Sequence, residues 1–248
     1  MSKPRVALVT GGTGGIGTAI CIALAEQGRK VIAGYFPPEQ KTAEDWQQKQ
    51  KVKGFDFEII GCDVSDFEST QVMLNDLKNT IGGIDILVNC AGITRDKTLR
   101  RMSVDQWSSV LSTNLDSVFN VTSQVVEDMS ANNFGRIVNI SSVNGQKGQY
   151  GQANYSAAKA GLLGFTKAVA QEMAGKGVTV NSVCPGYVKT EMTDAIPEEI
   201  RNAIIQQVPM GRMATPDEIA YAVSFLTDDR NNYMTGATLP VNGGMYMV

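Results

Sequence analysis

The sequence of 248 residues contains no histidine. Without an imidazole, the chain cannot form a Ser-His-Asp or Cys-His catalytic site, nor a metal site with histidine ligands. Its four cysteines, Cys21, Cys62, Cys90 and Cys184, form no C-x-x-C pair, so neither a zinc site nor a thioredoxin-like motif is expected. We therefore predict no bound metal. Dispersed thiols are typical of a reducing compartment, and we expect a cytoplasmic protein.

Charge and long apolar runs are also scarce. Charged residues make up 19% of the chain, and 22 Lys and Arg against 25 Asp and Glu give a net charge of −3. A dedicated nucleic-acid-binding protein normally has a basic face, so we expect no nucleic-acid partner. The longest apolar runs, such as residues 219–226, are far shorter than the roughly 18 residues of a membrane span, and we expect no signal peptide or membrane partner.

The chain does contain short apolar runs that alternate with helical segments. Seven of these runs are rich in Val and Ile and lack polar alternation, as expected of strands buried on both faces of a parallel sheet: residues 5–10, 31–34, 57–61, 84–89, 136–141, 178–183 and 237–241. The sequence therefore predicts an α/β fold, a Rossmann-type, doubly wound parallel sheet of about seven strands with helices on both faces. We expect a single domain over residues 1–248.

Three helix starts carry capping signals. Residues 65–68 (Ser-Asp-Phe-Glu) fit a capping box, in which the Ser65 hydroxyl accepts a bond from a free amide. Residues 215–218 repeat the pattern with Pro216 at the first helical position, and residues 103–106 are a weaker version.

Residues 188–213 separate the sixth predicted strand from the next capping box, and they include a short helical pattern at residues 198–207. Such a long excursion within a compact domain favours a flap over a substrate site.

A glycine-rich turn at residues 10–17 links the first strand to a helix at residues 16–25. Glycines let the backbone approach a pyrophosphate closely, and the helix N-terminus offers free N–H groups and a partial positive charge. A flexible turn has a similar composition, but the strand–turn–helix context favours a dinucleotide site. The residues predicted to bind the cofactor here are Gly11, Thr13, Gly14, Gly15, Ile16 and Gly17.

The spacing T-G-x-x-x-G-I-G resembles that of the short-chain dehydrogenase/reductase family, and the resemblance covers essentially the whole chain. Cys90 departs from the family pattern, which usually has asparagine there. The resemblance implies an oxidoreductase that uses a nicotinamide dinucleotide. Further family motifs follow in order: Asn89-Cys90-Ala91-Gly92, Asn114, Ser142, Tyr155 with Lys159, and Pro185-Gly186.

Tyr155 and Lys159 are four residues apart and so share one helix face. A tyrosine with its ordinary pKa of about 10 is a poor acid at neutral pH, and a nearby ammonium lowers that pKa. The pair therefore predicts a general acid that protonates an alkoxide. The resemblance implies that Ser142 holds the substrate carbonyl, Lys159 holds the nicotinamide ribose, and Asn114 orders a water that links Lys159 to solvent. Ser141 competes for the serine role, and the family spacing favours Ser142.

The end of the second strand bears on the choice of cofactor. An NAD site normally has a carboxylate about 20 residues after the glycine turn, whereas residues 33–38 hold no acid. A 2′-phosphate beside Tyr35 would meet no fixed repulsion, with Lys41 or Arg29 as the nearest cation. We predict NADPH (NADP). The other cofactor contacts implied by the resemblance are Asp63, Val64, Cys90, Ala91, Gly92, Tyr155, Lys159, Pro185, Gly186 and Val188.

Residues 92–96 and 141–152 resemble the corresponding stretches of acetoacetyl-CoA reductases. This resemblance implies NADPH-dependent reduction of acetoacetyl-CoA to an (R)-3-hydroxyacyl-CoA for polyhydroxyalkanoate synthesis. It also implies a homotetramer, with helices at residues 103–129 and 152–174 as interface elements. Core packing is the alternative interpretation of Tyr150 and Tyr187. The implied substrate residues are Asp96, Ser142, Gln149, Tyr150, Gly151, Gln152, Gly186 and Tyr187.

Two alternative functions stay open. A 3-oxoacyl-(acyl-carrier-protein) reductase shares residues 92–96, but an acidic carrier favours a basic docking surface. Residues 120–135 contain Glu127 and Asp128 and no cation, and Gln171-Glu172 adds none. A non-catalytic dinucleotide-binding sensor is the alternative of another class, and the full set of catalytic residues disfavours it. Cations available for coenzyme A phosphates are Lys97, Arg100, Arg101 and Lys147.

Overall fold

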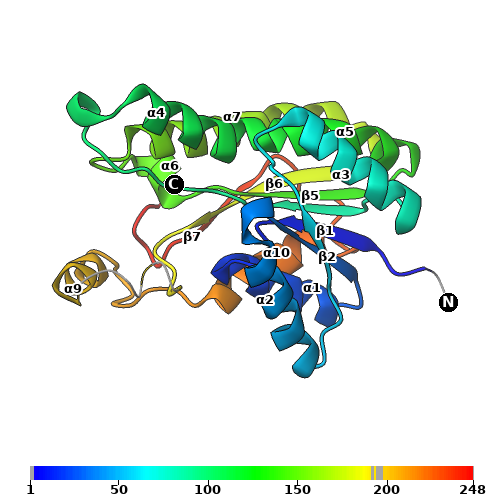
Figure 1. Ribbon diagram of the computed structural model, residues 1–248. Coiled ribbons are helices and arrows are strands. Elements are labelled where there is room, and N and C mark those ends of the chain that lie inside the picture. Colours follow the sequence, from blue (N-terminus) through cyan, green and yellow to red (C-terminus); the bar gives the residue numbers. More distant parts are fainter. Residues whose placement is uncertain (1–2, 191–192, 194–197, 248) are drawn as a thin grey trace.

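The computed structural model describes residues 3–190, 193 and 198–247. In this part of the chain seven parallel strands form one sheet in the order β3-β2-β1-β4-β5-β6-β7 (Figure 1). The predicted Rossmann-type parallel sheet is confirmed, and each predicted strand overlaps an observed one. The strands are β1 (Val6–Thr10), β2 (Lys30–Tyr35), β3 (Glu58–Gly61), β4 (Ile86–Asn89), β5 (Gly135–Ile140), β6 (Val178–Pro185) and β7 (Thr238–Val241).

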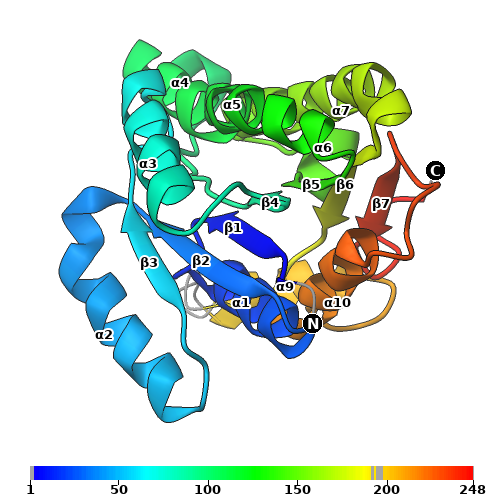
Figure 2. The same ribbon diagram turned by 90° about the vertical axis from the view of Figure 1, so that its right-hand side faces the viewer.

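Helices cover both faces of the sheet. Figure 1 shows α3, α5 and α7 above the sheet and α1 and α10 below it, and Figure 2 shows α1 and α10 side by side. None of the described helices has both the length and the apolar composition that a membrane crossing requires. The helices are α1 (Gly15–Glu26), α2 (Gln40–Val52), α3 (Phe67–Thr80), α4 (Val104–Leu111), α5 (Ser117–Ala131), α6 (Val143–Lys147), α7 (Ala153–Met173), α9 (Glu198–Gln206) and α10 (Pro216–Thr227), with the 3₁₀ turns η1 (Pro37–Glu39), η2 (Leu99–Arg101) and η4 (Ala174–Lys176) and the π-helical η3 (Ser112–Asp116).

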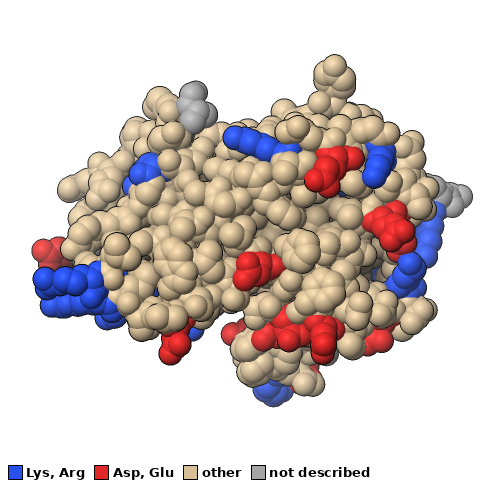
Figure 3. All heavy atoms as spheres, turned by 90° about the horizontal axis from the view of Figure 1, so that it is seen from above, with Lys and Arg blue, Asp and Glu red and all other residues tan. Residues whose placement is uncertain are grey.

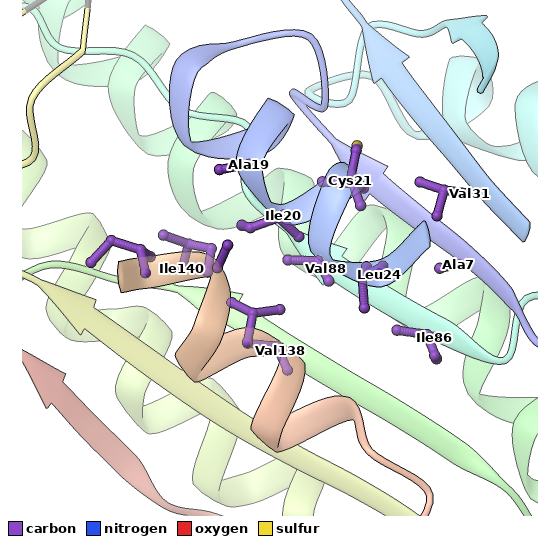
Figure 4. Close-up of a cluster of buried hydrophobic side chains, with 14 of the residues drawn as sticks. Ala7, Ala19, Ile20, Cys21, Leu24, Val31, Ile86, Val88, Val138 and Ile140 are labelled. Atoms are coloured by element: carbon purple, nitrogen blue, oxygen red, sulfur yellow. The ribbon is translucent and has the colours of Figure 1, made fainter. Parts of the chain in front are cut away.

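The strands read as continuous apolar runs because each strand contributes to two cores. On β1, Ala7 and Val9 pack in the cluster beneath the sheet, with Ile20 of α1 (Figure 4). Val6 and Leu8 point the other way, into the cluster formed with α3, α5 and α7. Both faces of a strand are therefore dry, and polar alternation along it is lost.

The strand order reverses between β1 and β4, so the chain leaves these two strands toward opposite faces of the sheet. A crevice forms between the two loops at the carboxyl ends of the strands. The Thr10 hydroxyl, at the end of β1, accepts hydrogen bonds from the amides of Cys90 (3.0 Å) and Ala91 (3.1 Å). Gly11 has φ of +63°, and a Cβ there would lie 2.9 Å from the Cα of Ala91. A Cβ on Gly17 would lie 2.1 Å from the Gly11 carbonyl oxygen. The turn therefore needs glycine for close backbone packing.

Two of the three predicted helix caps are confirmed. Thr215 and Ser103 form full capping boxes, and Pro216 occupies the first position of α10. The predicted cap at Ser65 is wrong, because Asp66 caps α3 by accepting a bond from the Ser69 amide at 2.6 Å. The Ser65 hydroxyl instead donates to Asp63 Oδ1 at 2.7 Å.

The helix expected over residues 103–129 is divided in the structure. The α-helical geometry of α4 gives way to the π-helical segment η3 and resumes in α5, which extends to Ala131. Segments of π-helix are rare and often lie at functional sites, and η3 contains Asn114.

The predicted flap, residues 188–213, lies partly outside the described residues, which omit 191–192 and 194–197. Its described part contains α9. Val188 is bridged to Ala214, and the Lys189 amide donates to the Ala214 carbonyl at 2.8 Å. The two ends of the predicted flap therefore lie side by side at Val188 and Ala214. Closure of the segment over a substrate stays a prediction.

The cap at Asp66 leads to a matched pair of variants. Asp66→Ala removes the acceptor for a helix N-terminal amide and should lower the free energy of unfolding by about 1 kcal/mol. Ser65→Ala should lower the free energy of unfolding by only about 0.3 kcal/mol, because the Ser65 hydroxyl makes its hydrogen bond outside the helix. Urea denaturation measures both values, and a larger loss for Ser65→Ala would contradict the assignment of the cap.

Candidate active site

Lys159 is almost fully buried although it carries a charged group. It lies on α7, one turn after Tyr155, and is 4% exposed. Its Nζ donates a hydrogen bond to the carbonyl of Ile140, at the end of β5, at 2.7 Å, and lies 5.8 Å from the centre of the Tyr155 ring. The predicted shared helix face for the two residues is therefore confirmed.

Burial shifts the pKa values of this pair in opposite directions. It lowers the pKa of Lys159 to about 8, an effect that the nearby thiols of Cys90 and Cys184 partly oppose. Burial also raises the pKa of Tyr155, an effect that the Ser142 hydroxyl opposes. This direction is opposite to the lowering expected from Lys159. The physical reason is that the Lys159 amine bonds the Ile140 carbonyl, while desolvation of the phenol dominates.

The two neighbouring serines have different partners. The Ser141 hydroxyl is 3% exposed and donates to the backbone carbonyl of Lys159 at 2.8 Å, so its proton is already used. Ser142 caps α6, and its Oγ accepts a bond from the Asn144 amide at 3.1 Å. The Ser142 proton is left for another acceptor, which favours Ser142 over Ser141.

Asn114 is fully buried in η3 and holds the loop after β4. Its side chain bonds both backbone groups of Ile93, accepting from the amide at 2.7 Å and donating to the carbonyl at 2.8 Å. A Cβ added at Gly92 would lie 3.0 Å from Asn114 Oδ1 and 3.7 Å from Lys159 Nζ. Gly92 therefore lies between these two predicted site residues. The water-ordering role of Asn114 stays a prediction.

The residues of the glycine turn suit a dinucleotide phosphate. No side chain caps α1, whose N-cap is Gly14, so its first amides face the crevice without a side-chain competitor. A Cβ on Gly15 would lie 2.9 Å from Thr190 Cγ2, which brings the segment after β6 next to this helix start. Thr13, Ile16, Pro185, Gly186 and Val188 belong to the same crevice edge, at the carboxyl ends of β1 and β6.

The residues predicted around the adenosine part fall into two groups. Tyr35 ends β2 and packs against Gly61, where a Cβ would lie 3.2 Å from the phenol ring. Lys41 is nearby in sequence on α2 but pairs with Asp45 at 2.8 Å. Arg29 as a phosphate-binding cation is wrong, because it precedes β2, at the opposite end of the sheet, and pairs with Asp229 at 2.7 Å.

Asp63 and Val64 follow β3 and are held by specific bonds. Asp63 Oδ1 accepts from the Ser65 amide at 3.0 Å, and the Val64 carbonyl accepts from Asn120 Nδ2 at 3.1 Å. These bonds fix the backbone of the turn at the carboxyl edge of the sheet, where both residues were predicted to contact the cofactor.

Asp96 and Gln152 are hydrogen-bonded to each other near Tyr155. Gln152 Nε2 donates to Asp96 Oδ2 at 2.7 Å, and the Gly151 carbonyl accepts from the Lys97 amide at 2.9 Å. Burial raises the pKa of both Tyr155 and Tyr187, and the negative charge of Asp96 adds to each rise. Asp96 therefore faces both tyrosines.

The remaining predicted substrate residues lie farther out. Tyr150 is 87% exposed, which rules out core packing, and Gln149 Oε1 accepts from Lys147 at 3.1 Å. Tyr187 is half-buried and lines a surface hollow with Val208, Met210 and Asn242, next to Gly186. The structure thus places Asp96, with Gln152 bonded to it, close enough to influence both Tyr155 and Tyr187, and it leaves Gln149 and Tyr150 at the loop surface.

Sequence reasoning missed the supporting role of several buried asparagines, of which it had named only Asn89, as part of a family motif. Asn154 is 0% exposed, and its amide group donates to the carbonyls of Arg95 (3.1 Å) and Gln106 (2.9 Å). Asn89 donates to Asn139 Oδ1 at 2.8 Å between β4 and β5. Asparagine is depleted in strands, so its presence in two buried strands was the available signal.

The fold and site together define a dinucleotide-dependent oxidoreductase. A glycine turn and an uncapped helix start lie at the point where the strand order reverses, and the half-buried Tyr155 and buried Lys159 lie near Ser142 at the same edge. Proton donation beside a dinucleotide site is the chemistry of carbonyl reduction and alcohol oxidation.

Comparison with known proteins agrees with this class. A sequence model of the family described as enoyl-(acyl carrier protein) reductase matches residues 11–246. The chain is 58% identical to the acetoacetyl-CoA reductase of Allochromatium vinosum over 243 residues, which are 98% of this chain and 99% of that protein. It is 50% identical to the acetoacetyl-CoA reductase of Cupriavidus necator over 243 residues, 98% of each chain. It is 47% identical to the 3-oxoacyl-(acyl-carrier-protein) reductase of Vibrio cholerae over 245 residues, also 98% of each.

The chain belongs to the short-chain dehydrogenase/reductase family, as its motifs predicted. It is an oxidoreductase that uses a nicotinamide dinucleotide, so the interpretation as a non-catalytic sensor is not supported.

The lowered pKa of Lys159 predicts how stability depends on pH. Below pH 8 the lysine is charged in both the folded and the unfolded chain, so the full cost of burying the charge is present. As pH rises from about 8 to 10.5, Lys159 loses its proton in the folded chain but keeps it in the unfolded chain. The free-energy cost of burying the charge is therefore relieved in this window. Relative to Lys159→Met, which cannot titrate, the wild-type protein should gain roughly 3 kcal/mol across this window.

Chemical denaturation of both proteins between pH 7 and 10.5 measures this difference. The two proteins share every other titrating group, so the difference between their unfolding free energies reports on Lys159 alone. A difference in unfolding free energy that stays constant with pH would show that Lys159 is not desolvated.

Proposed function

We propose that the protein reduces acetoacetyl-CoA with NADPH to an (R)-3-hydroxyacyl-CoA, which supplies polyhydroxyalkanoate synthesis. The observation that carries the proposal is the Asp96–Gln152 pair near the half-buried Tyr155. It gives the predicted acyl site a polar wall at the place where a proton donor is available. The acetoacetyl-CoA reductases at 58% and 50% identity support the same substrate.

The chain's own residues fit the cofactor that this reaction needs. The uncapped start of α1 at Gly14 would hold the pyrophosphate, and Lys159 with Tyr155 would hold the nicotinamide ribose. The backbone at Gly92, next to Lys159, would line the same crevice. When bound, the nicotinamide supplies a hydride to the 3-oxo carbon.

Tyr155 donates the proton that completes the reduction. Its raised pKa keeps the phenol protonated at neutral pH, so the donor is loaded before substrate arrives. Ser142 donates a hydrogen bond to the substrate carbonyl, because its oxygen already accepts from the Asn144 amide. The buried Lys159 ammonium stabilises the phenolate that is left.

Tyr155→Phe tests the acid role. The ring still packs and the other proposed cofactor contacts, including that of Lys159, are kept, but the donor is lost, so kcat should fall about 10²–10⁴-fold. NADPH binding, measured by fluorescence titration, should be nearly unchanged. Tyr221→Phe, at a 78% exposed tyrosine of α10, is the matched control and should retain wild-type kcat. Wild-type turnover in Tyr155→Phe would contradict the assignment of Tyr155 as the proton donor.

NADPH preference is the second part of the proposal. The end of β2 presents Tyr35 where an NAD site has a carboxylate. Tyr35→Asp should lower kcat/KM for NADPH about tenfold or more by repelling the 2′-phosphate, and it should harm NADH less. Tyr35→Asn is the control, because asparagine has the size of aspartate without its charge. The difference between the two variants gives the electrostatic contribution to the loss of NADPH activity. Steady-state kinetics of the native protein that favour NADH would contradict the preference.

An acyl carrier protein as the substrate carrier is the main alternative. The helical layer seen from above in Figure 3 is mostly uncharged, and it gives an acidic carrier little basic surface. Glu127 is exposed on α5, and its neighbour Asp128 is paired with Lys78 at 2.7 Å. We therefore favour coenzyme A.

We expect a higher kcat/KM for acetoacetyl-CoA than for the same acyl group on an acyl carrier protein. Glu127→Arg with Gln171→Arg should raise carrier activity at low salt, and the gain should fade near 0.1 M ionic strength, where charges more than about 10 Å apart are screened. Glu127→Gln with Gln171→Asn is the uncharged control. A native enzyme that prefers the carrier substrate would reverse the choice.

The proposal includes a homotetramer in the cytoplasm. Exposed aromatic side chains support association: Phe67 and Phe119 are 43% and 53% exposed and stack with ring centres 6.4 Å apart on α3 and α5. Clustered apolar exposure of this kind is typical of an interface. All four cysteines lie in the described residues and are free thiols, as expected in a reducing compartment.

A further inference from the structure

Asn144, at the start of α6, links the catalytic serine to the wall of the acyl pocket. Its backbone amide donates to Ser142 Oγ at 3.1 Å, and its side-chain Nδ2 donates to Gln152 Oε1 at 2.9 Å. Gln152 Nε2 donates in turn to Asp96 Oδ2 at 2.7 Å. The chain of bonds thus runs from an exposed carboxylate after β4, through the start of α7, to an amide that is only 8% exposed.

The direction of every bond in this chain is set at its outer end. An ionised carboxylate only accepts hydrogen bonds, so Gln152 must turn its amino group toward Asp96. Its oxygen then faces Asn144, which must present its own amino group. The orientation of the buried amide is therefore fixed by the charge on Asp96.

This orientation has a cost that packing does not explain. The Asn144 side-chain oxygen is buried and has no hydrogen-bond partner among the described residues. A buried acceptor without a partner destabilises the fold, and a leucine of similar size would avoid that loss. Stability alone therefore does not account for asparagine at this position.

The position of α6 matters for the whole catalytic group. The helix has only five residues, so its placement depends on its anchors. A Cβ on Gly145 would lie 2.7 Å from the carbonyl carbon of Lys159, which shows that α6 packs directly on the backbone of α7 at the catalytic lysine. A shift of α6 would therefore move Ser142 relative to both Lys159 and Tyr155.

We propose that Asn144 is a positioning residue for Ser142, held in place through Gln152 by Asp96. One chain of hydrogen bonds then couples the direction of the Ser142 hydroxyl to Asp96 and Gln152, the residues proposed to contact the acyl group. This inference rests on the proposed function, because it concerns the same reduction. It predicts that the pocket wall controls turnover as well as substrate binding.

Asn144→Leu tests the proposal, because it removes the bond to Gln152 and keeps the size and the backbone amide. We expect kcat with acetoacetyl-CoA to fall about tenfold or more, while KM for NADPH changes less than twofold. The midpoint of thermal unfolding should be equal to or above that of the wild type. Gln146→Leu is the matched control, since Gln146 lies on the same helix and its side-chain oxygen is also buried without a partner. It should retain wild-type kcat.

A double-mutant cycle with Ser142→Ala separates positioning from a general structural effect. Since Asn144 acts through the Ser142 hydroxyl, Asn144→Leu should reduce kcat by less than twofold in the Ser142→Ala background. An equal loss in both backgrounds would overturn the proposal, and so would wild-type kcat in Asn144→Leu. A wild-type protein without acetoacetyl-CoA activity would instead overturn the proposed function itself.

Discussion

The hydroxyl of Thr10 accepts the amides of Cys90 and Ala91, and these two bonds join the halves of the sheet where the strand order reverses. Because of them, the glycine turn after β1 and the loop after β4 lie against each other, with Gly11 packed on Ala91. The same β4 loop then reaches Asn114 and, past it, the Lys159 amine. The glycine turn and the loop that leads to Lys159 thus share one wall, so the crossover of the sheet brings the proposed cofactor crevice next to the proposed proton donor.

The features that the sequence predicted well depend on local chemistry or on residues at fixed spacing. The strands were recognisable because both of their faces are apolar, as Ala7 and Leu8 show by packing in opposite clusters. Tyr155 and Lys159 needed only helical geometry to share a face. The capping box at Thr215 is complete within four residues, so no distant contact was able to displace it.

The features that the sequence did not predict depend on competition between groups that only the folded chain brings together. Ser65 lost the capping role because Asp63 takes its hydroxyl and leaves the helix start to Asp66. Arg29 is close in sequence to the second strand, but the strand carries Tyr35 to the opposite end, where the cofactor site lies. The direction of the Tyr155 pKa shift depended on how far the folded chain removes the phenol from water, which helical spacing alone does not show.

One physical cause, loss of water around α7, sets both halves of the proton-transfer pair. Desolvation disfavours any charged form, so it raises the pKa of the phenol and lowers that of the amine to about 8. At neutral pH the phenol therefore keeps its proton, and most of the lysine still carries its charge. The negative Asp96 reinforces the first effect at Tyr155. In the proposed reduction the Tyr155 phenol thus starts protonated and ends as a phenolate, the form that burial makes costly. Lys159, which still carries most of its charge at neutral pH, offsets part of this cost, so the burial that destabilises the lysine is tolerable only because the charge is kept beside the phenol.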